Sequence, residues 1–346
     1  MSDSYRNLNQ FKIDPLSEIR NAGIVTNGHV LWVKATADAD YTTLGDQVGY
    51  DSIRPTLNNV VDQAMTVTDR NDYILVTPPA SNAPYTLTEG VNVAKNRLHI
   101  VGVGYNPTEY GKVTLRGFAT AAPDTVDTEL MAVTGAGVEL RGITLLGTAN
   151  TSSRGTINNG VLNLGTASTG TPHGFYAKNV TVESNSSAAD NGTADILVIE
   201  GNVSTGIQGI RFDDSWLGNW SHAPTNGIVS MSGTAGPTRT EFRNTTFVID
   251  AQATTDKFVT MGTGALQYTL FENCKFINVE AATAPASALT GALLVDNPVL
   301  MHDNMYLNVT EAGTDTEVFK APVASGTSAV IRDYGIAVGT SALTPV

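Results

Sequence analysis

A weak repeat runs through residues 140–308 as a pattern of apolar and polar positions. In each of six segments an apolar residue is followed by two polar positions, after which the apolar alternation of a strand resumes. The segments are LRGITLLG, AKNVTVES, FDDSWLGN, FRNTTFVI, FENCKFIN and MHDNMYLN, and they begin at Leu140, Ala177, Phe212, Phe242, Phe271 and Met301. A spacing of 20–50 residues between repeats is typical of a solenoid, a propeller or another array.

Each column of this alignment has its own character. The first column is apolar, the fourth small or medium and the sixth apolar, and because strand residues alternate between two faces, these three columns are expected to point inward. The second column is polar and usually charged: Arg141, Lys178, Asp213, Arg243, Glu272 and His302. The third column holds residue types that best tolerate left-handed backbone: Gly142, Asn179, Asp214, Asn244, Asn273 and Asp303. A sharp corner is therefore predicted at the third column.

A second short strand precedes each segment. These strands are rich in β-branched residues and often end at glycine, as in GVLNLG at 160–165 and DILVIEG at 195–201. One repeat is then strand, turn, strand, corner, strand and variable loop, which is one coil of a parallel β-helix. We predict an all-β solenoid of about nine coils, roughly 40 Å long at the usual spacing between strands.

The corner resembles the pectate-lyase-like superfamily of right-handed β-helices, in which a two-residue turn carries a stacked asparagine ladder. The matching positions here are Asn179, Asn244 and Asn273, with Asp214 and Asp303 as variants. Residues 72–104 resemble the opening coil of that superfamily, and the resemblance covers roughly residues 30–340. It implies a right-handed β-helix but says little of function, because this fold carries enzymes, adhesins and virion parts alike.

One long helical pattern precedes the coils, in SIRPTLNNVVDQAM at residues 52–65. Its apolar residues fall on one face at helical spacing: Ile53, Leu57, Val60, Val61 and Ala64. Such a helix is expected to cover the open end of the core. We divide the chain into an N-terminal docking arm at 1–30, an opening strand, a loop (41–50) and the capping helix at 31–70, and the β-helix at 71–346.

Composition narrows the function. The chain has 346 residues, of which 41% are hydrophobic and 15% charged, and its net charge is −13. That acidity argues against a nucleic-acid partner, which would need a basic surface. The one cysteine, Cys274, lies in an inward column and is expected to be a buried, inert thiol. No signal peptide and no membrane-spanning apolar run are visible, so we expect synthesis in a host cytoplasm.

Candidate chemistry gathers around Arg211, Asp213, Asp214, Trp216, Trp220 and His222. The resemblance implies two kinds of site: lyases that hold calcium with carboxylates and use an Arg or Lys as base, and hydrolases that divide acid and base roles between carboxylates. The weak catalytic candidates are Asp213, Asp214, Arg243 and Glu272. Trp216, Trp220 and His222 are candidates for carbohydrate binding. The five histidines lack metal-ligand spacing, so no metal or cofactor is expected.

The charged column also has a purely structural explanation. From Lys178 to Glu272 the sign of the charge alternates from coil to coil, which avoids repulsion between like charges on adjacent strands. We therefore predict a non-enzymatic virion protein: a capsid decoration, head spike or fibre of a bacteriophage. Its docking residues would be Phe11, Ile13, Leu16 and Ile19 in the N-terminal arm.

The expected partners are the major capsid protein or another virion protein, together with host surface glycans. The resemblance implies a homotrimer, and neither nucleic acid nor membrane is expected as a partner. The alternative is a polysaccharide-degrading enzyme, either a lyase or a glycoside hydrolase of the tailspike type. That alternative requires Asp213, Asp214, Arg243 and Glu272 to converge in an open cleft.

Overall fold

The structure is a computed structural model. It describes residues 28–38, 40–57, 61, 64, 70–79, 83–87, 89–104, 112–117, 129–147, 160–165, 170–184, 195–201, 206–218, 220, 227–233, 236–251, 253, 256–261, 268–279, 289–291, 299–307 and 337–338.

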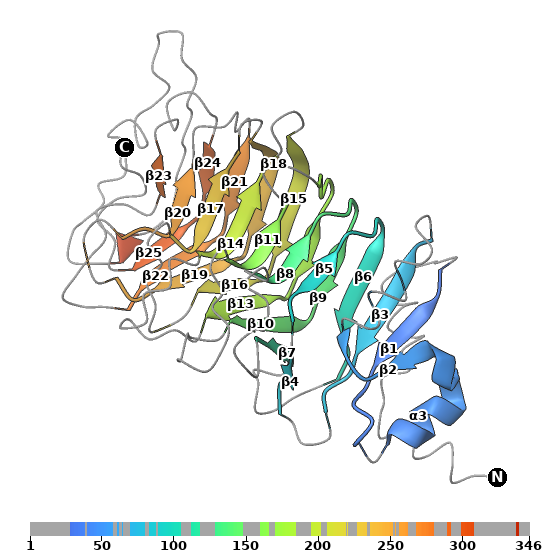
Figure 1. Ribbon diagram of the computed structural model, residues 1–346. Helices are drawn as coiled ribbons and strands as arrows, with labels where there is room; N and C mark the ends of the chain where they lie inside the picture. The colour runs from blue at the N-terminus through green and yellow to red at the C-terminus, as the bar shows by residue number, and fades with distance from the viewer. Residues whose placement is uncertain are drawn as a thin grey trace.

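The strands of these described residues form three parallel sheets that run along a right-handed β-helix, and each coil adds one strand to each sheet (Figure 1). Sheet A has the order β2 (Ile53–Arg54), β1 (Val30–Val33), β3 (Asp72–Val76), β6 (Leu98–Gly102), β9 (Glu139–Arg141), β12 (Tyr176–Lys178), β15 (Ile207–Asp213), β18 (Pro237–Arg243), β21 (Thr269–Glu272) and β24 (Val299–His302).

Sheet B, in the same direction along the rod, has β4 (Tyr85–Thr86), β7 (Val113–Arg116), β10 (Ile143–Gly147), β13 (Thr181–Ser184), β16 (Trp216–Gly218), β19 (Thr246–Ile249), β22 (Lys275–Asn278), β25 (Met305–Leu307) and β26 (Ala337–Val338). Sheet C has β5 (Val91–Val93), β8 (Glu129–Val133), β11 (Gly160–Leu164), β14 (Asp195–Glu200), β17 (Val229–Ser232), β20 (Val259–Met261) and β23 (Leu289–Gly291). The predicted parallel β-helix is confirmed.

The interior of the coils is filled by stacked aromatic rings. Against sheet A, the Phe242 ring lies 5.4 Å from Phe212 and 5.2 Å from Phe271, measured between ring centroids. Against sheet B, the Phe276 ring lies 4.8 Å from Phe247 and 5.2 Å from Tyr306. All these side chains are buried, as the first and sixth columns predict. Each stacked pair adds about 0.5–1.5 kcal/mol beyond the burial of its apolar area.

Each coil turns from sheet A into sheet B at a left-handed corner. The corner column, defined as Gly142, Asn179, Asp214, Asn244, Asn273 and Asp303, has φ between 49° and 60° throughout. The corner N–H donates to the next coil, as from Asn244 to the Glu272 carbonyl at 2.9 Å. The Asn244 amide also donates to Asp214 Oδ1 at 3.2 Å, so the side chains form a ladder of their own. The corner is thus fixed by backbone and side chains together.

Polar residues in the inward fourth column bond to the backbone at these corners. Ser215 Oγ donates to the Asp213 carbonyl at 2.8 Å, and Asn304 Nδ2 donates to the Phe271 carbonyl at 3.0 Å. Cys274 is buried and free, and burial raises the pKa of its thiol to about 12. The column therefore keeps its polar groups hydrogen-bonded inside the core, as buried polar groups require.

The N-terminal end differs from the prediction in one element. Residues 41–50, expected to be a loop, form helix α3 (Tyr41–Val48) and the 3-10 turn η1 (Tyr50–Ser52). By local propensity a glycine disfavours a helix, but here the Tyr50 ring packs so closely that a Cβ on Gly45 would lie 2.4 Å from Tyr50 Cε1, so the tertiary contact requires glycine inside the helix. The predicted capping helix was expected to begin at Ser52. The first residue described as helical is Leu57, because Ile53 belongs to β2.

The capping helix is present where it is described. Leu57, Val61 and Ala64 are helical and buried in the main core, whereas Val60 lies outside the described residues. Helix α3 lies at the N-terminal end of the rod (Figure 1). It covers a different surface, because its Tyr41 and Leu44 pack with Trp32 and Leu75 on the outward face of sheet A. From β9 onward every strand of this face carries one residue of the charged second column of the repeat, and these residues form the site described next. No helix among the described residues is long and apolar enough to cross a membrane.

Candidate functional site

Two columns of side chains project from the outward face of sheet A beyond α3. The first is the charged column, Arg141, Lys178, Asp213, Arg243, Glu272 and His302, whose members are in register on adjacent strands. The second lies two residues earlier on each strand: Glu139, Tyr176, Arg211 and Glu241, followed by the apolar Leu270 and Leu300 on β21 and β24. Strand alternation places both columns on the same face.

Asp213 is held by two side chains of the second column. Arg211 Nε donates to its Oδ1 and Arg211 Nη2 lies near its Oδ2, both at 2.8 Å, in a two-pronged ion pair. The Tyr176 hydroxyl donates to Oδ2 at 2.9 Å. The Tyr176 ring lies between two guanidiniums, 5.7 Å from Arg141 and 5.8 Å from Arg211. Asp213 is thereby fixed in place and only 8% exposed.

These contacts shift the pKa of both partners. Burial, followed by the hydrogen bond to Asp213, raises the pKa of Tyr176 to about 12. The hydrogen bond to Asp213 raises the pKa of Arg211. Both groups therefore keep their protons at neutral pH and act as donors to the Asp213 carboxylate.

Arg243 lies between two carboxylates. Its Nη1 is 2.8 Å from Glu272 Oε2 on the next strand, and its Nη2 is 3.2 Å from Glu241 Oε2 on its own strand. His302 Nδ1 lies 4.0 Å from Glu272 Oε1 and 3.3 Å from Asp303 Oδ2. Charge alternation along the column therefore gives the Arg243–Glu272 pair, but Asp213 pairs with Arg211 rather than with Arg243.

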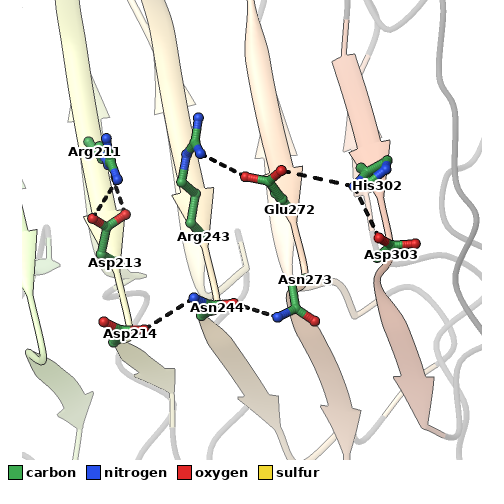
Figure 2. Close-up of a pocket in the computed structure, with 9 residues that line it drawn as sticks. All are labelled: Arg211, Asp213, Asp214, Arg243, Asn244, Glu272, Asn273, His302 and Asp303. Atoms are coloured by element: carbon green, nitrogen blue, oxygen red, sulfur yellow. Dashed lines mark hydrogen bonds and ion pairs between the residues drawn. The ribbon is translucent and has the colours of Figure 1, made fainter.

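These residues line one open groove of about 500 Å³. Figure 2 shows the charged column along the groove and the corner column beneath it, with the side chains of strands β15, β18, β21 and β24 side by side. We call this the ladder groove; it is lined by Arg211, Asp213, Asp214, Arg243, Asn244, Glu272, Asn273, His302 and Asp303. All four weak catalytic candidates, Asp213, Asp214, Arg243 and Glu272, face it.

The carbohydrate candidates lie elsewhere. Trp216 follows the corner onto the outward face of sheet B, and its ring centroid is 5.4 Å from that of Trp220. Trp220 is 54% exposed, whereas the Trp216 indole N–H already donates to the Gly218 carbonyl at 2.9 Å. His222 and the docking candidates Phe11, Ile13, Leu16 and Ile19 lie outside the described residues.

The sequence analysis missed the part of the site that comes from the second column. Tyr176 and Glu241 were not named, although strand alternation places a residue two positions before the charged column on the same face. Reading every second residue along each strand would have found both. His302 and Asp303 appeared only as members of their columns.

The described residues do not indicate a metal site. Within the described ranges, no three His, Cys, Asp or Glu side chains cluster in a way that could hold a metal ion.

Comparisons with known proteins identify the fold. No protein-family model matches the chain, and no curated protein matches it. Solved structures do: a pectin methylesterase in complex with a hexasaccharide has a TM-score of 0.50 at 13% identity, covering 92% of this chain and 91% of its own. Pectin methylesterase PemA from Erwinia chrysanthemi has a TM-score of 0.48 at 14% identity, covering 92% and 91%. Pectate lyase Pel9A has 0.44 at 13% identity, covering 93% and 79%.

The first of these likenesses corrects the prediction of a non-enzymatic virion protein. The solved structure at a TM-score of 0.50 is named a pectin methylesterase, which favours the enzyme alternative over a capsid decoration, head spike or fibre. The physical reason for the error lies in the charged column. Its alternating charges were assigned to surface stability alone, whereas four of its members line one open groove.

Proposed function

We propose that this chain is a polysaccharide-cleaving enzyme that holds a glycan in the ladder groove and hydrolyses a glycosidic bond. One observation carries the proposal: Asp213, Asp214, Arg243 and Glu272 face a single open groove on the outward side of a β-helix. A shared fold alone would not carry it, since one fold hosts many activities.

The spacing of two carboxylates supports hydrolysis. Asp213 is in register with Arg243, and Arg243 with Glu272, so the Cα atoms of Asp213 and Glu272 are two strand spacings apart, about 9.5 Å. Glycosidases place their two carboxyl groups about 5–9.5 Å apart on either side of the bond that they cleave. Side chains on strands two spacings apart can reach such a separation, with room for a sugar between them.

The contacts of the two carboxylates suit different roles. Asp213 accepts hydrogen bonds from Arg211 and Tyr176 that fix its position, and we assign it the general base that activates water. Glu272 is more accessible, at 36% side-chain exposure, and we assign it the proton donor to the leaving oxygen. Arg243 has a second partner in Glu241 and can release Glu272 to accept a proton as the sugar enters.

Cleavage of a polysaccharide panel tests this function. The purified chain is incubated with neutral and acidic polysaccharides, and new reducing ends, unsaturated products and released methanol are measured separately. Hydrolysis gives reducing ends alone. Unsaturated products would indicate a lyase and methanol an esterase, and either result would contradict the proposed reaction.

Charge-removing variants connect the activity to the groove. Asp213→Asn and Glu272→Gln should each lower the rate by about 10²–10⁴-fold, the range expected for loss of a general acid or base. Glu89→Gln, the same change at an exposed residue outside the groove, should leave the rate unchanged. Equal activity in all three variants would exclude the ladder groove as the active site.

A further inference from the structure

The charges that line the ladder groove identify the class of glycan it accepts. Its lining carries four carboxylates, on Asp213, Asp214, Glu272 and Asp303, against two guanidiniums, on Arg211 and Arg243. Over the outward face from β9 to β24, Glu139 and Glu241 join the carboxylates, and Arg141, Lys178 and the exposed Arg239 of β18 join the cations, which makes six against five. The site is acidic on a chain whose net charge is −13.

Both guanidiniums of the groove are already engaged. Arg211 contacts both carboxylate oxygens of Asp213. Arg243 contacts Glu272 and Glu241. A sugar carboxylate or sulfate entering the groove would have to compete with these internal carboxylates for an arginine, at a site where the added negative charge is repelled by four others.

Two other carboxylates of the groove are exposed and each has one oxygen engaged within the protein. Asp303, with 58% side-chain exposure, has its Oδ2 beside His302, and Asp214, exposed in the corner column, accepts from Asn244 through Oδ1. Carboxylate oxygens only accept hydrogen bonds, and sugar hydroxyls are donors. The corner amides of Asn244 and Asn273 lie in the same wall and add further hydrogen-bonding groups. The groove thus presents acceptors for hydroxyl groups rather than cations for acidic ones.

We infer that the ladder groove binds a neutral, hydroxyl-rich polysaccharide and rejects one that carries uronate or sulfate groups. The inference rests on the proposed function for the location of the site, and it adds the class of substrate. It distinguishes this chain from proteins that act on an acidic polymer, although the fold is shared.

Binding to matched polymers tests the inference. The probes are polygalacturonate, the same polymer after chemical reduction of its carboxyl groups to a neutral galactan, and an array of neutral, uronate-bearing and sulfated oligosaccharides. We expect retention by neutral members of the panel, with affinity changed less than about twofold between low and high salt. Retention by uronate-bearing or sulfated probes alone would overturn the inference.

A double variant changes the charge without changing the corner. Asp214→Asn with Asp303→Asn replaces two carboxylates by amides at φ values of 51° and 55°, which Asn adopts readily. We expect acidic probes to bind at least about threefold more tightly to this variant at low salt, and the gain to vanish at high salt. An unchanged affinity for acidic probes would contradict an electrostatic exclusion.

The outcomes separate this inference from the proposed function. Cleavage of an acidic glycan that Asp213→Asn abolishes would overturn the neutral specificity and leave the hydrolase standing. Binding of a neutral glycan in the groove without cleavage would support the specificity and overturn the hydrolase. Failure of every probe to bind would overturn both.

Discussion

A single asparagine shows what each corner of the rod requires. Asn244 has φ of 49°, donates from its side chain to Asp214 and accepts from Asn273. Alanine there would lose both side-chain bonds and meet the steric penalty of left-handed backbone, so Asn244→Ala should lower the free energy of unfolding by about 2 kcal/mol. Asn244→Gly keeps the φ without the bonds and should cost about half as much. Urea denaturation measures both, and equal losses would refute the role of φ.

A second residue gives a prediction about pH. Lys112 Nζ donates to Thr181 Oγ1 at 2.8 Å, and burial lowers the pKa of Lys112 to about 8, partly opposed by Glu183. Between pH 8 and the ordinary value of 10.5, the unfolded chain binds a proton that the folded chain has lost. Because the unfolded state binds more protons in this range, the free energy of unfolding increases as the pH rises from about 8 to about 10.5.

The matched variant isolates that effect. Lys112→Met lacks the titrating group, so the wild type should gain about 1–3 kcal/mol of stability relative to it as pH rises from about 8 to about 10.5. Thermal melts of both proteins across this range provide the measurement. Lys275→Met, at an exposed position of β22, is the control: the stability difference between it and the wild type should stay constant over the same pH range. Parallel pH profiles for wild type and Lys112→Met would rule out the shift.

At the scale of the element, the aromatic stacks join one coil to the next. Phe242 contacts Phe212, Phe271 and Phe247 at centroid distances of 5.2–5.4 Å. Phe242→Ala should therefore destabilise the protein by about 3–5 kcal/mol, and Phe242→Leu by less than about 1.5. Denaturant unfolding tests the difference. A loss below about 1 kcal/mol for Phe242→Ala would show that the coils do not depend on the stack.

The elements also show what the sequence could predict. The inward columns and the left-handed corner follow from residue type and strand periodicity, which depend only on neighbours along the chain. Helix α3 was missed because the Tyr50 ring leaves room only for a glycine at position 45 of the helix. Local helix propensity does not include such a packing contact. The contact of Tyr176 with Asp213 joins residues 37 positions apart through side-chain orientation, so no local pattern reveals it.

At the scale of the whole molecule, helix α3 and the charged face divide sheet A in two. The α3 end is apolar and covered, and the face from β9 to β24 carries the charged column. A glycan in the ladder groove would cross β15, β18, β21 and β24, a span of about 14 Å at the usual strand spacing. Polymer binding is therefore expected to depend on length.

That dependence is measurable with neutral oligosaccharides of increasing length. Affinity should rise with each added sugar until the ligand spans the four strands and then level off. Isothermal titration calorimetry provides the curve. Trp220→Ala tests whether the exposed tryptophan that follows β16 lets longer oligosaccharides gain further affinity. An affinity that is independent of length would contradict a ligand lying along the rod.

The corner column has a consequence for how such a protein changes size. Each corner repeats the same φ, and its N–H donates to a carbonyl of the next coil. One coil can therefore be inserted or deleted without altering the geometry of the neighbouring coils. Duplicating residues 211–240 would lengthen the groove by one strand and add one more Arg211–Asp213 pair to its wall. The length of the groove is thus set by the number of coils. Duplication of one coil within the gene would lengthen the groove by one strand, while the side chains within each coil stay the same.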